Sequence, residues 1–119
     1  MISILKSFLY AIEGVIDGGR NERNFKIHIV FAILTVSFAF LLNFSLTKWF
    51  ILLLTIGIML ALELMNSAVE RTVDLITEDY HPLAKQAKDL AAGSVFIFSV
   101  IAVIIGILLF AGPLIEYIV

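Results

Sequence analysis

Three long uncharged runs dominate the pattern of hydrophobic and polar positions along the chain. No Asp, Glu, Lys or Arg occurs within residues 29–47, 49–62 or 90–115. A helix needs about 20 mainly apolar residues to cross a membrane. The first and third runs are long enough alone, whereas the second is long enough only if its helix continues through Glu63 toward Asn66. The pattern predicts three transmembrane helices, at about residues 28–47, 49–70 and 88–115.

A different periodicity governs the N-terminal stretch SILKSFLYAIEGVID, residues 3–17. At 100° per residue its apolar side chains fall on one side of a helix and its polar side chains on the other. The polar side consists of Lys6, Tyr10, Glu13 and Asp17. Such a helix lies on a membrane rather than across it. We therefore expect an amphipathic surface helix over residues 3–19, ended by Gly18 and Gly19.

Composition agrees with a membrane protein. Hydrophobic residues make up 61% of the 119 residues, charged residues make up 15%, and the mean hydropathy is +1.08. The absence of cysteine excludes disulfides, thiolate metal sites and a cysteine nucleophile. A formal charge of −2 gives no reason to expect nucleic-acid binding. Without internal repeats or a linker, residues 1–119 are expected to form a single membrane-embedded domain.

The basic residues indicate how the chain is oriented. Lysine and arginine concentrate before the first span and between the second and third, whereas only Lys48 lies in the first loop and none follows the third span. Basic residues favour the cytoplasmic side. The N-terminus and the loop at residues 70–89 are therefore expected to be cytoplasmic, with the C-terminus outside. This arrangement describes a multi-pass membrane protein.

A polar stripe follows the second predicted span. Glu63, Asn66, Glu70 and Asp74 share an arc of about 80° on a helix. A charged group at mid-helix in a membrane costs about 2.5–3.5 kcal/mol on insertion scales, so such a group usually has a function and faces protein or water. The alternative, a solvated helix end at the interface, applies most readily to Asp74. The stripe indicates a polar site at the cytoplasmic end of the second span.

The chemistry of these carboxylates favours a divalent cation. Mg²⁺ binds through one or two carboxylate oxygens together with water and phosphate oxygens. Glu22 stands among Arg20, Arg23 and Lys26, which is unusual company unless phosphate is also present. The alternative for the basic residues is an anchor to anionic lipid headgroups. That alternative does not explain Glu22.

The segment EDYHPLAKQAKD at residues 78–89 leads into the third span. Asp79 and Pro82 mark a turn, and Lys85 and Lys88 lie on one helical face. Lysine is a point-charge partner for phosphate. A lone histidine such as His81 is more often a hydrogen-bonded turn residue than a ligand. None of the common nucleotide-binding loops is present in the chain.

Taken together, these motifs resemble a known family. They are NExxF at residues 21–25, ExxNSAxE at 63–70 followed by Asp74, and YHPLAKQAKD at 80–89. The combination is similar to the small prokaryotic diacylglycerol kinases, and particularly to their undecaprenol kinase branch. The resemblance covers almost the whole chain, with the motifs in the same order.

The resemblance implies an all-α homotrimer of three-span subunits that transfers the γ-phosphoryl group of Mg-ATP to a lipid alcohol at the cytoplasmic interface. Undecaprenol is favoured by the HPLAKQAKD form of the loop, and diacylglycerol is the alternative. The implied roles are a general base, Glu63, with Asn66 beside it, and a Mg²⁺ site at Glu22 and Glu70. The implied ATP contacts are Tyr10, Glu22, Glu70, Asp79, Tyr80, His81, Lys88 and Asp89, in sites shared between subunits. Where some members carry an arginine this chain has Ser3, and Lys6 is a candidate to replace it.

Two non-enzymatic alternatives are less well supported by the residues. An ion or proton carrier requires polar groups across the whole membrane. Beyond Leu62 the second span offers only Thr55, and the first part of the third offers only Ser94 and Ser99. A purely structural membrane subunit leaves Glu63 without a purpose.

Overall fold

Four helices make up the computed structural model, which describes residues 2–119. They are α1 (Ile2–Asn21), α2 (Arg23–Leu41), α3 (Leu46–Ile76) and α4 (Pro82–Ile118), and no strand occurs within the described residues. The expected all-helical class is confirmed. The last three helices are each long and apolar enough to cross a membrane. This property indicates an integral membrane protein.

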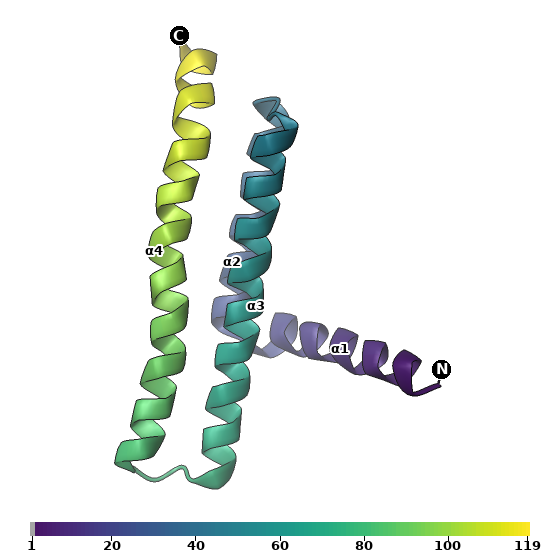
Figure 1. Cartoon of the computed structure of the whole chain (residues 1–119), viewed down its shortest axis with the longest axis vertical. Coiled ribbons are helices and arrows are strands. Elements are labelled where there is room, and N and C mark those ends of the chain that lie inside the picture. Colours follow the sequence, from purple (N-terminus) through teal and green to yellow (C-terminus); the bar gives the residue numbers. More distant parts are fainter. Residues whose placement is uncertain (1) are drawn as a thin grey trace.

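The long helix α3 is the centre of the arrangement, because it contacts each of the other three. It runs antiparallel to α4, and α2 packs against it, lying behind it in the view of Figure 1. In contrast, α1 leaves the three long helices at a steep angle (Figure 1). The α1–α2 junction and the α3–α4 loop lie toward one end of the long helices, which we call the inner end. The α2–α3 turn and the C-terminus lie at the opposite, outer end.

The outer turn differs from the prediction. The helix α2 ends at Leu41, and the connection comes at residues 42–45 rather than at Lys48. Asn43 adopts φ 53°, in the left-handed region that asparagine tolerates better than most residues. Ser45 then caps α3 by accepting a hydrogen bond from the Lys48 backbone N–H, at 3.3 Å. The predicted end of the first span at residue 47 is therefore wrong, and Lys48 belongs to the first turn of α3.

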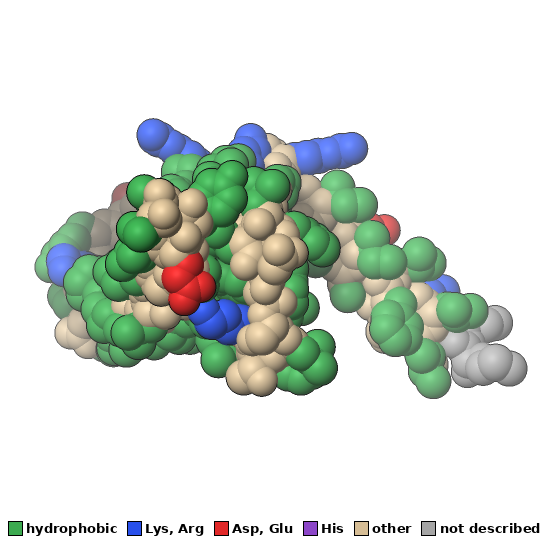
Figure 2. Space-filling view, turned by 90° about the horizontal axis from the view of Figure 1, so that it is seen from above, with side chains coloured by type: hydrophobic (Ala, Val, Ile, Leu, Met, Phe, Trp, Pro, Cys, Tyr) green, Lys and Arg blue, Asp and Glu red, His purple; other side chains and the backbone are tan. Residues whose placement is uncertain are grey.

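A small core closes this outer end. Its buried members are Ala39, Phe44, Leu52 and Leu109. The Lys48 ammonium group donates to the Leu109 carbonyl at 3.1 Å. Seen from above, hydrophobic side chains cover most of the visible surface (Figure 2). Exposed apolar side chains on this scale suit a lipid environment rather than water.

The inner junction also differs from the prediction. The helix α1 continues through Gly18 and Gly19 to Asn21, and the break comes at Glu22, which has extended backbone angles of φ −104° and ψ 112°. A Cβ added at Gly18 would lie 2.6 Å from Leu64 Cδ2. Gly18 therefore allows α1 to approach α3 closely. Its role is in packing between helices, and the prediction that it ends the helix is wrong.

Candidate functional site

The four stripe residues of α3 differ in depth. Glu63 is 3% exposed and Asn66 is 9% exposed. Glu70 is half-buried and Asp74 is exposed. Because the chain remains helical from Leu46 to Ile76, the stripe leads from the protein interior to the inner surface. A reactant in the membrane and a reactant in water could therefore reach the same helix face.

Glu63 meets a partner that the sequence did not reveal. His28 Nε2, on α2, lies 3.2 Å from Glu63 Oε1, and the two side chains are 26% and 4% exposed. A lone histidine within an apolar run carries no signal in sequence that it will face a particular carboxylate. The pairing follows from the packing of α2 on α3. It gives the buried carboxylate a polar neighbour, which buried charges need.

An apolar groove of about 360 Å³ begins beside this pair and extends between α2, α3 and α4. Leu109 and Phe110 line it near the outer end. Apart from His28, the polar side chains along its wall are Thr35, Thr55 and Ser99. The hydroxyl groups of these three donate to backbone carbonyls of their own helices. The groove therefore offers hydrocarbon-like walls with one titratable group, at the inner end.

Asn66 links the buried and exposed halves of the stripe. Its Nδ2 lies 3.5 Å from Glu70 Oε1, and its Oδ1 is buried with no hydrogen-bond partner among the described residues. Buried polar atoms are normally paired. The amide oxygen of Asn66 and the carboxylate of Glu70 are hard oxygen donors close to one another, which is the donor chemistry that Mg²⁺ prefers.

An ionic cluster attaches α1 to α3. Arg71 donates two hydrogen bonds to Asp17, at 2.6 and 3.1 Å, and two to Glu22 Oε1, also at 2.6 and 3.1 Å. The hydrogen bonds from Arg71 and from Asn21 lower the pKa of Asp17 to about 2. Neither Asp17 nor Arg71 was predicted to belong to the site. Asp17 was predicted only to lie on the polar face of the N-terminal helix. The sequence does not show which helix that face contacts.

The α3–α4 loop contains three of the residues predicted to contact ATP, Asp79, Tyr80 and His81. His81 caps α4, because its Nδ1 accepts from the Leu83 backbone N–H at 3.1 Å. The Asp79 backbone N–H donates to Thr77 Oγ1 at 3.1 Å, and Tyr80 is 80% exposed. The predicted turn is confirmed here.

Two ion pairs engage the predicted site residues of α4. Lys88 donates to Asp74 at 2.6 Å, and Lys85 donates to Asp89 at the same distance. The first pair joins α4 to the stripe. Asp74 therefore has a partner on α4 and is more than a solvated helix end.

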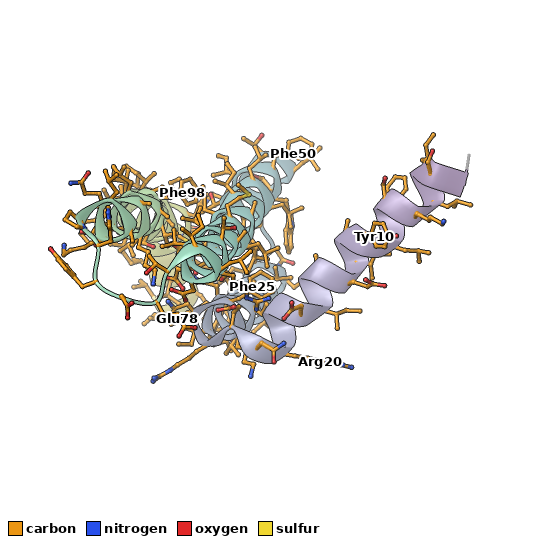
Figure 3. All side chains as sticks on the ribbon, turned by 90° about the horizontal axis from the view of Figure 1, so that it is seen from below. Tyr10, Arg20, Phe25, Phe50, Glu78 and Phe98 are labelled. Atoms are coloured by element: carbon orange, nitrogen blue, oxygen red, sulfur yellow. The ribbon has the colours of Figure 1, made fainter. Side chains whose placement is uncertain are left out.

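The predicted residues do not all gather in one place. The Glu63–His28 pair, the Asn66–Glu70 contact and the Arg71 cluster all involve α3 toward its inner end. Tyr10 lies out along α1, which leads away from the long helices, whereas Glu78 marks the loop on the other side of α3 (Figure 3). Within residues 2–119, no three or more His, Asp or Glu side chains form a group that could hold a metal ion.

Comparison with known proteins identifies the family. The family model for prokaryotic diacylglycerol kinase matches residues 9–110. The chain belongs to the prokaryotic diacylglycerol kinase family. It is 50% identical over 109 residues to the undecaprenol kinase of Bacillus subtilis, covering 92% of this chain and 89% of that one. It is also 40% identical over 115 residues to a Synechocystis diacylglycerol kinase, covering 96% of this chain and 66% of the relative.

A third relative is more distant in sequence. The diacylglycerol kinase of Escherichia coli K12 is 32% identical over 101 residues, which cover 85% of this chain and 83% of that one. The resemblance stated from the sequence is confirmed, and the chain is a lipid kinase. The carboxylates and cations at the inner end are its candidate active site.

Proposed function

We propose that this kinase transfers the γ-phosphoryl group of ATP to undecaprenol at the cytoplasmic face of the bacterial cell membrane. The relative that is 50% identical is an undecaprenol kinase, which supports this acceptor. Relatives that are 40% and 32% identical are diacylglycerol kinases, so diacylglycerol is the alternative acceptor. In this orientation the inner end of the long helices is cytoplasmic. The surface helix α1 then lies along the membrane with its apolar side toward lipid.

The observation that carries the proposal is the burial of Glu63. A carboxylate that is 3% exposed within an apolar helix requires a reason to be there. Glu63 is the general base that accepts the proton of the lipid hydroxyl. Its position suits this role, because it is the deepest acid of the stripe and lies beside the apolar groove. Asn66, one turn closer to the inner end, is the polar neighbour of the reacting oxygen.

Glu22 and Glu70 are the proposed Mg²⁺ ligands. The fit rests on the chemistry of the oxygen atoms. Glu70 and Asn66 Oδ1, which has no hydrogen-bond partner among the described residues, supply oxygen ligands. Glu22 Oε1 accepts hydrogen bonds from Arg71, which leaves the second carboxylate oxygen of Glu22 for the metal. A Mg²⁺ ion held by these residues would supply positive charge to offset that of the transferring phosphate. Arg71 holds the Glu22 side chain at the α1–α2 junction.

ATP is proposed to contact Tyr10, Asp79, Tyr80, His81, Lys88 and Asp89. Tyr10 and the α3–α4 loop lie on different sides of α3 in one chain (Figure 3). This separation supports a homotrimer in which α1 of one subunit meets the loop of the next. Lys88 would exchange its contact with Asp74 for a phosphate oxygen. Until ATP binds, Asp74 holds the Lys88 side chain.

The reaction needs little covalent help from the protein. Phosphoryl transfer passes through a loose transition state, so positioning and charge neutralisation supply most of the catalysis. Lys88 contributes positive charge, and Glu63 takes the hydroxyl proton as the new bond forms. The apolar groove and the surrounding helices keep water away from Glu63. Exclusion of water favours transfer to the lipid over hydrolysis of ATP.

A phosphotransfer assay tests the acceptor. Purified protein in detergent micelles receives γ-labelled ATP and Mg²⁺, with undecaprenol or diacylglycerol offered separately at equal mole fraction. We expect label in undecaprenol well above label in diacylglycerol. The reverse preference would assign the chain to diacylglycerol phosphorylation, and label in neither lipid would contradict the proposal.

A further inference from the structure

The proposed reaction gives no role to the contact between His28 and Glu63. His28 Nε2 lies 3.2 Å from Glu63 Oε1, at the point where α2 packs on α3. Glu63 is almost fully buried, whereas a quarter of the His28 side chain is exposed. Around the pair the groove is lined mainly by aliphatic and aromatic side chains. Among the described residues, His28 is the charged or titratable partner that this carboxylate meets.

The chemistry of the contact fixes the role of each atom. The two atoms stand at ion-pair distance without the alignment of a hydrogen bond. An ionised carboxylate only accepts hydrogen bonds, so the contact can become one only with the hydrogen on His28 Nε2. Oε1 faces that nitrogen, which leaves Oε2 to accept a proton. A general base works best when a third group orients it, as in other enzymes with a base and an orienting partner. A buried carboxylate without such a partner would be free to rotate away from the hydroxyl.

We infer that His28 is a positioning residue that holds Glu63 for proton abstraction from the lipid hydroxyl. This inference rests on the proposed role of Glu63 as the base. His28 also lines the inner end of the apolar groove, so the same ring that orients the base borders the space next to it. Contacts of this kind are often poorly aligned without substrate and tighten when the site is filled. His28 acts through Glu63 and does not itself touch the reacting atoms.

The test compares His28→Ala with His28→Gln in the same micelle assay. His28→Ala removes the donor, and we expect kcat to fall about tenfold, by analogy with the loss of a group that orients a metal ligand. The KM for ATP should stay unchanged, since no nucleotide contact is altered. His28→Gln supplies a side-chain N–H and should recover most of the lost kcat. Thr35→Val, which changes another polar residue of the same groove wall, should leave kcat unchanged.

Two results would overturn the inference. One is an unchanged kcat in His28→Ala. The other is an equal loss in His28→Ala and His28→Gln with raised KM values for both substrates, which would indicate a general structural defect. Failure of the proposed base is a separate result, because it appears as normal turnover in Glu63→Gln. An inactive Glu63→Gln together with a fully active His28→Ala would keep the base and reject His28 as its partner.

Nitrogen NMR provides a measurement that does not depend on turnover or on the stability of His28→Ala. In wild-type protein labelled with ¹⁵N-histidine, the His28 resonances, assigned by their absence in His28→Gln, should show the hydrogen on Nε2. Glu63→Gln should shift the Nε2 resonance. A ring with its hydrogen on Nδ1, insensitive to Glu63→Gln, would overturn the inference.

Discussion

Replacing Gly18 by alanine tests whether close packing of α1 on α3 holds the inner end together. The new Cβ would lie 2.6 Å from Leu64 Cδ2 and 3.4 Å from the Phe25 ring, so α1 or Leu64 must move. Forcing an extra methyl group into a packed contact typically costs about 1–3 kcal/mol. Alanine also gains about 0.5–1 kcal/mol over glycine within a helix. The two effects oppose each other, so a single variant is not decisive.

A matched control separates these terms. Gly14 lies one turn earlier on α1, and a Cβ there meets no atom within 4 Å. Gly14→Ala therefore carries the helix gain without the clash. The difference between Gly18→Ala and Gly14→Ala isolates packing, and we expect α1 in Gly18→Ala to open more easily by about 1–3 kcal/mol.

Hydrogen exchange of the α1 backbone amides measures this difference, because exchange reports the free energy of local opening. Adding Leu64→Ala to Gly18→Ala should restore part of the protection by making room for the new methyl group. Equal protection in Gly18→Ala and Gly14→Ala would refute the packing role of Gly18. It would also leave the Arg71 cluster as the main attachment of α1.

Three further predictions concern charge and metal at the inner end. The pKa of Asp17 is lowered from 3.8 to about 2. The contribution of Asp17 to holding α1 should therefore be complete above pH 4 and decline as the pH falls through 2. Asp17→Asn should abolish this part of the pH dependence of hydrogen exchange in α1. Glu70→Ala should raise the Mg²⁺ concentration needed for turnover, and an unchanged Mg²⁺ titration would remove Glu70 from the metal site. Mixed oligomers of inactive Glu22→Ala and inactive Glu63→Ala subunits should regain activity if sites are shared, whereas no recovery in well-mixed oligomers would place each site within one chain.

The sequence predicted the features that depend on long hydrophobic runs. Three spans and a polar stripe beginning at Glu63 could be seen because apolar length and helical spacing are encoded locally. The turn at residues 42–45 was missed, since Asn43 sits in an uncharged run and the boundary was placed at the charged Lys48. Gly18 was misread because a glycine near a helix end fits both a terminator and a close contact.

The contacts within the site depend on which helices meet. His28 could not be assigned to Glu63, because the two are far apart in sequence and neither residue specifies its partner. The same holds for Arg71, which follows Glu70 on α3 but turns toward Asp17 on α1. Family resemblance supplied roles for residues that match motifs. It assigned no role to His28 or Arg71, which lie outside those motifs.

The most direct test of the central claim is the turnover of Glu63→Gln, which keeps the shape of the side chain and removes its basicity. The assay uses γ-labelled ATP, Mg²⁺ and undecaprenol in micelles, with the oligomer and ATP binding checked independently. The account predicts that wild-type protein labels undecaprenol and that Glu63→Gln does so about 10²–10⁴-fold more slowly. Near-normal labelling by an intact Glu63→Gln would contradict the assignment of the buried carboxylate as the base.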